Sequence, residues 1–214
     1  GYDNVESILK DCAEGKIEFP VIMKPVDSSG SKGTTVLRVG DEIKKAAEFA
    51  FSFSRCHRVI VENYIEKKHQ YLIGGDIFVV DGKIILWGLL NCHRDANVNP
   101  LVPVGKSYPL QIDQEDQKRI QDVLRLLVEK LQIKTGAMNI EAVIDNENRV
   151  WLIDVGPRSG GNMIPDLLGE MYRVDIAEMS IKAAMGEKIT AMPVEPQHCY
   201  ATYNLHSACN GKYN

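Results

Sequence analysis

The chain has 214 residues, of which 44% are hydrophobic and 25% are charged, as in an ordinary globular protein. This length suits one domain or two lobes that share a cleft. The formal net charge of -4 offers no basic field for nucleic acid or for an anionic membrane. No apolar run approaches the roughly 20 residues that cross a bilayer. We therefore expect neither a nucleic-acid partner nor a membrane partner.

The five cysteines are odd in number and form no CxxC pair, which argues against a disulfide framework and against a zinc site. They are typical of reduced thiols in the cytosol, and no signal peptide is evident. The chain opens on Gly1 rather than a methionine and continues into a polar, helix-like stretch. We therefore expect a cytoplasmic protein of which this chain is an excised piece.

The first third of the chain alternates helical patterns with short apolar runs. One helix is predicted over 3–14 with Asp3 as its N-cap, and another up to Phe53 with Asp41 as its N-cap. Strands are predicted over 19–24, 34–39 and 58–64, with a Gly/Ser loop over 25–33.

Further along, strands over 71–80 and 83–91 meet at Asp81-Gly82, a strong hairpin signal. The Pro-, Asn- and Gly-rich stretch 94–109 predicts an ordered surface loop. Asp113 caps a helix whose apolar residues recur at helical spacing up to Leu131. Strands over 136–144 and 150–155, a polar loop, a helix over 175–186 and a weakly patterned tail after Met192 complete the prediction. Helices mixed with hairpins indicate an α+β fold rather than a doubly wound parallel sheet.

The first chemical signal is Lys24, a lysine at the end of an apolar strand, which loses solvation free energy unless an anion meets it. A loop of small residues follows, and its hydroxyls and backbone N–H groups can approach a phosphate closely. The residues that carry this hypothesis are Ser28, Ser29, Gly30, Ser31 and Gly33. A mobile surface turn whose lysine extends to solvent is an equal alternative.

Two common phosphate motifs are excluded by spacing. A Walker A loop needs a glycine directly before its lysine, whereas Lys32 follows Ser31. A protein kinase places its Gly-rich loop before the strand lysine, and here Lys24 comes first.

The strongest signal is a pair of apolar strands around the polar turn 145–149. If the turn centres on Glu147-Asn148, Asp145 faces Val150, and Glu141 faces Asp154. Carboxylates opposed in this way, with Cβ atoms about 5 Å apart, need a shared proton or a shared cation. Magnesium held by two carboxylates and substrate phosphates is the common solution. A one-residue slip of the turn would remove the facing pair.

Two further residues belong with this hairpin. Asn139 shares a strand face with Glu141 and offers a neutral oxygen ligand. Arg158 follows Asp154 by four residues and suits a phosphoryl group or an acyl phosphate because it stays charged. The alternative is that Glu141 pairs with a lysine, Asp154 caps a loop, and Arg158 forms a surface ion pair.

The strand over 58–64 ends in Glu62, Tyr64 and Ile65, which can contact an adenine edge. Taken alone, the pattern is more typical of a strand that leaves the core into solvent. His69 alone is more typical of a structural histidine than of a catalyst. Cys92-His93-Arg94 is ambiguous, and no second ligand at useful spacing supports zinc there.

A strand lysine with a Ser/Gly loop, the Glu62 strand, and a two-carboxylate hairpin that ends in Pro157-Arg158 occur here in one order. In this order they resemble the ATP-grasp superfamily, particularly carbamoyl-phosphate synthase-like and biotin carboxylase-like members. The resemblance covers residues 4–189. Each motif is weak singly, but the combination at these spacings is specific.

The resemblance implies two α+β lobes with antiparallel sheets that clasp ATP. Lys24 would contact the phosphates beneath a flap over 28–33. Glu62, Tyr64 and Ile65 would hold adenine, while His69 or Gln70 lies near the family's ribose-binding acid. The implied parts are a small lobe over 1–65, a large lobe over 66–192, and the start of a truncated C-terminal segment over 193–214.

For the reaction, the resemblance implies Mg²⁺, or Mn²⁺ in its place, on Glu141, Asp154 and Asn139. Arg158 would stabilise an acyl phosphate, and Gly160, Gly161, Asn162 and Arg94 would contact the acid. Family members usually carry Asn where this chain has Gly156, which puts the metal affinity in question, and Asn139 is our hypothesis for its replacement. The family's N-terminal lobe is not found in the sequence.

The implied activity is that of an ADP-forming ligase that activates a small carboxylic acid as an acyl phosphate for attack by an amine or a thiol. A non-catalytic ATP-binding module and a small-molecule kinase are the alternatives. A homodimer would form through regions outside the chain.

Overall fold

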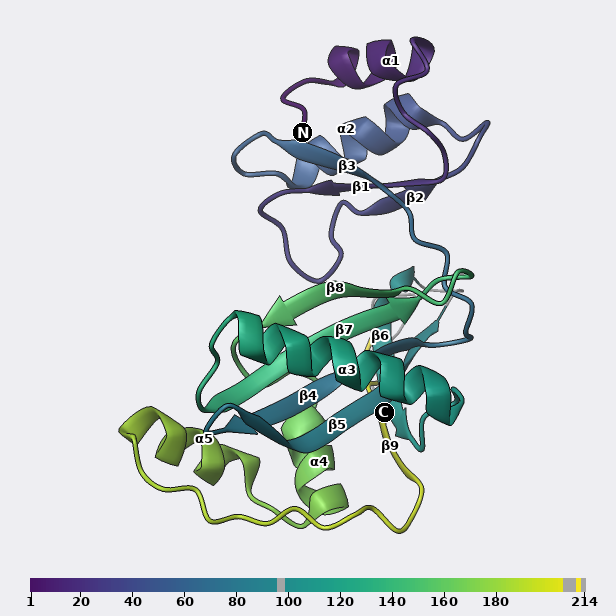
Figure 1. The fold of residues 1–214 in the computed structure, drawn as a ribbon. Coiled ribbons are helices and arrows are strands. Elements are labelled where there is room, and N and C mark those ends of the chain that lie inside the picture. The colour runs from purple at the N-terminus through teal and green to yellow at the C-terminus, as the bar shows by residue number, and fades with distance from the viewer. Residues whose placement is uncertain (96–98, 206–210, 213–214) are drawn as a thin grey trace. The chain divides into compact units, whose positions relative to one another are not determined.

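The computed structural model describes residues 1–95, 99–205 and 211–212 (Figure 1). The chain divides into two compact units, Gly1–Ile65 and Glu66–Asn214. Each unit contains one antiparallel sheet with helices packed on it. Within the described ranges, no helix is both long enough and apolar enough to pass through a bilayer. The predicted α+β class is confirmed.

The first unit is built on a three-stranded sheet in the order β2-β1-β3. The strands are β1 (Val21–Pro25), β2 (Thr35–Leu37) and β3 (Val59–Asn63), and the helices are α1 (Val5–Ala13) and α2 (Ile43–Phe53). Both helices lie on one side of the sheet (Figure 1). Because side chains alternate along a strand, Val21 and Met23 enter this core, whereas Lys24 lies on the opposite face.

The helix starts differ from the prediction in both helices of this unit. Asn4, not Asp3, caps α1, and its Oδ1 accepts the Ser7 N–H at 2.8 Å. The N-cap of α2 is Glu42, which makes no capping hydrogen bond through its side chain. Asp41 instead accepts the backbone N–H of Arg38. Asp41 therefore closes the preceding turn, a competing use of a short carboxylate.

The second unit is a six-stranded antiparallel sheet in the order β8-β7-β4-β5-β6-β9. Its strands are β4 (Leu72–Val80), β5 (Lys83–Asp95), β6 (Asn99–Tyr108), β7 (Gly136–Ile144), β8 (Val150–Gly156) and β9 (Tyr200–Tyr203). The central strands β4 and β5 form the hairpin predicted at Asp81-Gly82. Asp81 and Gly82 both have positive φ, as such a turn requires.

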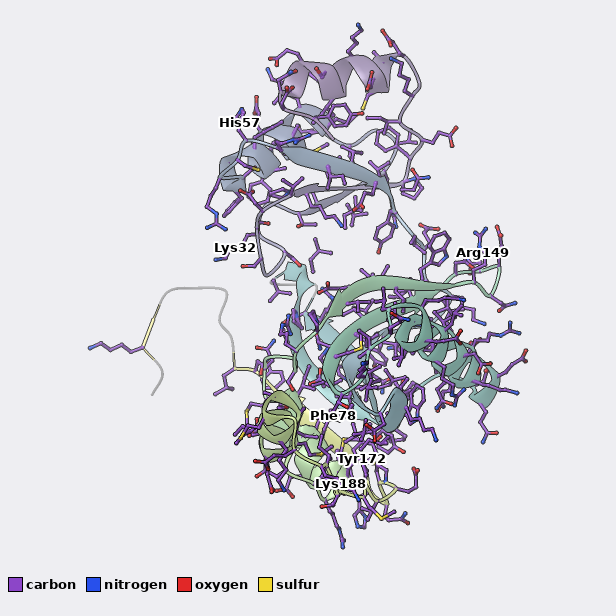
Figure 2. All side chains as sticks on the ribbon, turned by 60° about the vertical axis from the view of Figure 1, so that its left-hand side comes forward. Lys32, His57, Phe78, Arg149, Tyr172 and Lys188 are labelled. Atoms are coloured by element: carbon purple, nitrogen blue, oxygen red, sulfur yellow. The ribbon has the colours of Figure 1, made fainter. Side chains whose placement is uncertain are left out.

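The two faces of this sheet have different covers (Figure 1). Helix α3 (Gln114–Lys130) packs Ile120, Leu124 and Val128 on one face. Helices α4 (Ile164–Tyr172) and α5 (Ile176–Met185) pack on the other face around Phe78 and Tyr172, which Figure 2 labels. The Tyr172 hydroxyl donates to the Trp87 carbonyl at 2.6 Å, so the end of α4 is hydrogen-bonded to β5.

Three elements were missing from the prediction: β6, α4, and β9, which lies in the weakly patterned tail after Met192. The stretch 94–109, expected as a loop, contains the end of β5 and all of β6, with residues 96–98 outside the described ranges. Pro103 lies opposite Arg94 at a break in the register, where a strand tolerates proline. Helix α4 was expected as loop, but its proline lies in the first turn, where no intrahelical N–H bond is lost.

His69 links the start of β4 to β7 through backbone groups. Ile144 donates its N–H to Nε2 at 2.9 Å, and Nδ1 lies 2.5 Å from the Tyr71 carbonyl oxygen. Because an amide N–H only donates, Nε2 is the acceptor, and Nδ1 carries the proton. Burial lowers the pKa of His69, which favours this neutral form.

We therefore expect acid to destabilise the protein through His69. The unfolded chain takes up this proton near pH 6.5 and the folded chain only at lower pH, so unfolding binds a proton in between. The free energy of unfolding should fall as pH drops below about 6.5, by at most about 1.4 kcal/mol per pH unit. Urea unfolding of wild type and His69→Gln across this range measures it, and the variant should have a shallower slope. Equal slopes would contradict the assignment.

Candidate functional site

The hairpin of β7 and β8 brings two carboxylates face to face. Glu141 pairs with Asp154, and Asn139 pairs with Gly156. Residues directly opposite in an antiparallel pair project to the same side of the sheet. Glu141, Asp154 and Asn139 therefore share one face, opposite the face on which α3 packs.

The strand register of this hairpin differs at the turn from the predicted one. At the turn, Ile144 rather than Asp145 pairs with Val150, so the predicted register was wrong there by one residue. The register then shifts between Glu141 and Ala142, and Ile153 is the extra residue on β8. This β-bulge restores the Glu141–Asp154 pair.

The Asp145 side chain fixes the register of the turn through hydrogen bonds. Its Oδ1 accepts the N–H groups of Glu147 and Arg149, both at 2.9 Å, and its Oδ2 accepts from the Trp151 indole at 2.8 Å and from Arg149 Nε at 2.7 Å. Burial raises the pKa of Asp145, but these hydrogen bonds outweigh it and lower the pKa. Figure 2 shows Arg149 at this end of the hairpin. Asp145 is thus a structural residue.

Within the described ranges, the side-chain carboxylates of Glu141 and Asp154 have neither an ion-pair partner nor a hydrogen-bond partner. Asp154 is exposed and Glu141 is half-buried. Two facing negative charges repel, and a divalent cation between them removes the repulsion. The described residues contain no cluster of three His, Cys, Asp or Glu side chains suited to a metal. An all-oxygen set of two carboxylates and an amide fits Mg²⁺ that keeps positions for phosphate oxygens.

Next to this pair, on the same face, lies a buried carboxylate that the sequence analysis did not assign. Asp76 of β4 is 2% exposed and pairs with Asn139. Asn139 Nδ2 donates to Asp76 Oδ1 at 2.8 Å and to the Gly75 carbonyl at 3.1 Å. Burial raises the pKa of Asp76, and the hydrogen bonds from Asn139 and Gly160 act against this.

The loop after β8 carries Arg158 back over the same face. A Cβ added at Gly156 would lie 3.6 Å from the Arg158 Cζ and Nε atoms, so the guanidinium lies over this glycine. Gly160 donates its N–H to both Asp76 oxygens, at 3.0 and 2.8 Å. A Cβ at Gly160 would lie 2.6 Å from Asn139 Nδ2, so no side chain fits there. Asn162 follows with φ 55° and leads into α4.

A buried lysine lies on this face as well. Lys106 of β6 is 4% exposed, and its Nζ donates to Cys92 Sγ of β5 at 2.7 Å. Burial raises the pKa of Cys92, and Lys106 opposes this. His93, Arg94, Lys106 and Thr202 are among the residues lining a cavity of about 440 Å³. Lys106 was missed because its strand was expected to be a loop.

In the first unit, Lys24 and Glu62 form an ion pair. Lys24 pairs with Ile60, and Ile22 pairs with Glu62, so the two charged residues are diagonal neighbours on the face opposite the helices. Tyr64 follows Glu62, donates its N–H to the Pro20 carbonyl at 2.9 Å, and has the Arg38 guanidinium 5.9 Å from its ring centre. Lys24 and the predicted adenine contacts, Glu62, Tyr64 and Ile65, thus all belong to this unit, which ends at Ile65.

The loop over 28–33 has a tight internal structure. Ser28 Oγ donates to the Lys32 carbonyl at 2.8 Å, and Gly30, Ser31 and Gly33 all have positive φ. Figure 2 labels Lys32 on this loop. Before the loop, the Asp27 carboxylate accepts from Ser54 Oγ at 3.0 Å and from the Cys56 N–H at 2.8 Å. These bonds join the start of the loop to the end of α2.

The ribose candidates lie in the second unit. Both ring nitrogens of His69 are engaged with backbone groups, as described above, and the Gln70 carbonyl accepts from Lys67 Nζ at 2.8 Å. The predicted nucleotide residues therefore divide between the units, with those from Lys24 to Ile65 in the first and His69 and Gln70 in the second.

Comparison with known proteins identifies the class of this domain. The model of the ATP-grasp domain family matches residues 17–166. The chain is 24% identical over 185 residues to the C-terminal section of the carbamoyl phosphate synthase large chain of Aquifex aeolicus, covering 86% of this chain and 33% of that protein. The chain belongs to the ATP-grasp domain family, as its motifs predicted.

Solved structures have the same fold. The biotin carboxylase domain of Hydrogenobacter thermophilus 2-oxoglutarate carboxylase, in complex with MgADP, ADP and bicarbonate, matches with a TM-score of 0.71 at 18% identity, over 92% of this chain and 43% of that one. Carboxyaminoimidazole ribonucleotide synthase from Aspergillus clavatus, complexed with ATP, matches with a TM-score of 0.74 at 11% identity, over 94% and 49%. The chain thus spans less than half of these relatives.

Gly33 gives a test of the loop's anchoring. A Cβ there would lie 2.8 Å from Pro25 Cγ and 2.9 Å from Phe53 Cβ, whereas a Cβ at Gly30 meets nothing within 4 Å. Both glycines have positive φ. Gly33→Ala should lose about 2–4 kcal/mol of unfolding free energy through strain and overpacking, and Gly30→Ala about 1 kcal/mol through strain alone. Urea unfolding monitored by circular dichroism measures both. Equal losses would contradict this packing.

Proposed function

We propose that this chain is the nucleotide-binding part of an ATP-dependent ligase that releases ADP. In this proposal a small carboxylic acid is activated as an acyl phosphate, and an amine or a thiol then attacks it. The observation that carries the proposal is the Glu141–Asp154 pair without a cationic partner among the described residues. Membership of the ATP-grasp family and the MgADP-bound relative support it.

The proposed metal site consists of Glu141, Asp154 and the carbonyl oxygen of Asn139. Mg²⁺ bound there, or Mn²⁺ in its place, would neutralise charge on the ATP phosphates during phosphoryl transfer. Glu141 and Asp154 supply the two negative charges, and Asn139 replaces the amide that many family members carry where this chain has Gly156.

The residues of the first unit are proposed to hold the nucleotide. Lys24 would contact the phosphates, and Ser28–Gly33 would cover them with backbone N–H groups and hydroxyls. Glu62, Tyr64 and Ile65 would hold adenine. Because Lys24 and Glu62 pair with each other in this structure, ATP binding has to replace that ion pair with contacts to phosphate and base. His69 is left out of this set because both its ring nitrogens are used.

The proposed chemistry has two steps. A carboxylate oxygen of the acid attacks the γ-phosphorus, the bond to the β–γ bridging oxygen breaks, and ADP leaves. The Arg158 guanidinium, which cannot lose its charge, would stabilise the transferring phosphoryl group and the acyl phosphate. The amine or thiol then attacks the acyl carbon, and inorganic phosphate leaves.

The acid is proposed to bind beside Arg158, at the turn Gly160–Gly161–Asn162 and near Arg94. Cys12, Cys56, Cys92 and Cys199 are free thiols, which suits the proposed place in the cytoplasm. We propose no nucleic-acid or membrane partner for this net charge of -4, and a homodimer that forms through regions outside this chain.

Removing one carboxylate tests the metal site. Glu141→Gln should reduce acid-dependent ADP release at least about 100-fold at fixed Mg²⁺, because a direct ligand is lost. Its melting temperature should stay level or rise, since the repulsion from Asp154 is gone. Glu147→Gln is the matched control, as it changes an exposed acid in the turn of the same hairpin, and it should keep wild-type turnover. Full activity in Glu141→Gln would exclude the proposed role.

Arg158→Lys tests the step that separates a ligase from its alternatives. The variant keeps the positive charge but loses the planar guanidinium and its paired N–H donors, so kcat should fall about 100- to 1000-fold with little change in KM for ATP.

ADP release from wild type with pools of acids, with and without hydroxylamine, provides the assay that separates the ligase from its alternatives. A trapped hydroxamate supports an acyl phosphate. A stable phosphorylated product identifies a small-molecule kinase, and nucleotide binding without turnover identifies a non-catalytic module.

A further inference from the structure

We propose that Asp76 is a positioning residue, which orients the Asn139 amide and fixes the turn at Gly160 and thereby sets the affinity of the Glu141–Asp154 site for a divalent cation. This inference rests on the proposed function, because it assigns a task within the same site. Asp76 itself is not proposed as a ligand of the cation.

The position of Asp76 in the sheet deprives its carboxylate of hydration, which is unfavourable for the folded state. It lies on the central strand β4, is 2% exposed, and pairs with Gly88 on one side and with Asn139 on the other. A Cβ added at Gly88 would lie 2.4 Å from Leu168 of α4, so α4 packs directly on the neighbouring strand. Within the described ranges no lysine or arginine forms an ion pair with Asp76. The N–H groups of Asn139 and Gly160 offset part of its lost hydration, and the positive charges of Arg158 and Lys106 act in the same direction from a longer distance.

The first task of this carboxylate is to select one orientation of Asn139. The two hydrogens of Nδ2 are directed to Asp76 Oδ1 and to the Gly75 carbonyl. Neither acceptor carries a hydrogen. A rotation of the Asn139 amide by about 180° would therefore place its carbonyl oxygen next to these two acceptor oxygens, which is unfavourable. The Asn139 carbonyl oxygen is therefore held on the side away from Asp76. A ligand oriented in this way by a neighbouring carboxylate binds a metal more tightly than a freely rotating one.

The second task is to hold the turn that follows Arg158. Both carboxylate oxygens of Asp76 accept the Gly160 N–H. Asn139 Nδ2, Asp76 Oδ1 and the Cα of Gly160 are so close that a Cβ at Gly160 would lie 2.6 and 2.9 Å from the first two. The chain between Gly156 and α4 is thus bound to the same carboxylate that orients Asn139.

The alternative is that Asp76 only stabilises the fold, and Asp116 is the matched control. Asp116 is also buried, at 5% exposed, and its carboxylate accepts from Lys68 Nζ at 2.8 Å. It lies on α3, which covers the opposite face of the sheet. Asp116→Asn should therefore lower the melting temperature without changing cation affinity. Asp76→Asn should have the same two effects if Asp76 is purely structural.

The test is Mn²⁺ binding to the ADP complex, followed by the electron paramagnetic resonance signal of free Mn²⁺. Asp76→Asn keeps the shape but presents an NH₂ group to donors, so the Asn139 amide loses its preferred orientation. We expect Mn²⁺ to bind about 10- to 100-fold more weakly, while metal-free ADP affinity stays at the wild-type value. Asp116→Asn should bind Mn²⁺ as wild type does.

Unchanged Mn²⁺ affinity in Asp76→Asn, with wild type binding normally, would overturn the inference and leave the proposed function standing. Absence of ADP-dependent Mn²⁺ binding in wild type would instead refute the proposed function, and the inference with it. If Asp76→Asn does not fold, Gly160→Ala disturbs the same contact from the other side and should weaken Mn²⁺ binding likewise. Wild-type Mn²⁺ affinity in folded Gly160→Ala would then count against the inference.

Discussion

The repulsion between Glu141 and Asp154 is the constraint around which the second unit is organised. Antiparallel pairing places the two carboxylates opposite each other, and none of the described lysines, arginines or histidines forms an ion pair with them. Such a pair lowers stability unless an ion binds there. Because the net stability of a protein is only a few kcal/mol, a destabilising pair of this kind is retained mainly where function requires it. This is why we regard the hairpin as a binding element.

The sheet face that carries this pair is divided between packing and chemistry. Helix α4 and Phe78 make part of it an apolar core, while Asp76, Asn139 and Glu141 make the adjoining part polar. Asp76 lies between the apolar core and the polar residues. It connects them because it accepts hydrogen bonds from the sheet residue Asn139 and from Gly160, shortly before α4. The rigid core thus supports the polar groups, as precise binding requires.

Much of the fold followed from local patterns. The hairpin at Asp81-Gly82 and the helix capped by Asp113 have strong short-range signals, and both are present. Strand β6 and helix α4 escaped prediction because turn-forming residues lie in or next to them, and only neighbouring strands and the apolar face of the sheet stabilise them. The register of β7 and β8 was wrong at the turn because the hydrogen bonds of Asp145 decide it.

The sequence by itself determined the family and the α+β class, and it singled out Glu141 and Asp154 as candidate metal ligands, because alternating strands and ordered motifs are local features of the chain. Tertiary structure alone decided that a β-bulge at Ile153 brings these two residues opposite each other. It also decided that Asp76, Lys106 and Gly160 join them on one face. Those contacts join strands far apart in the chain, and which strands become neighbours depends on packing of the whole sheet.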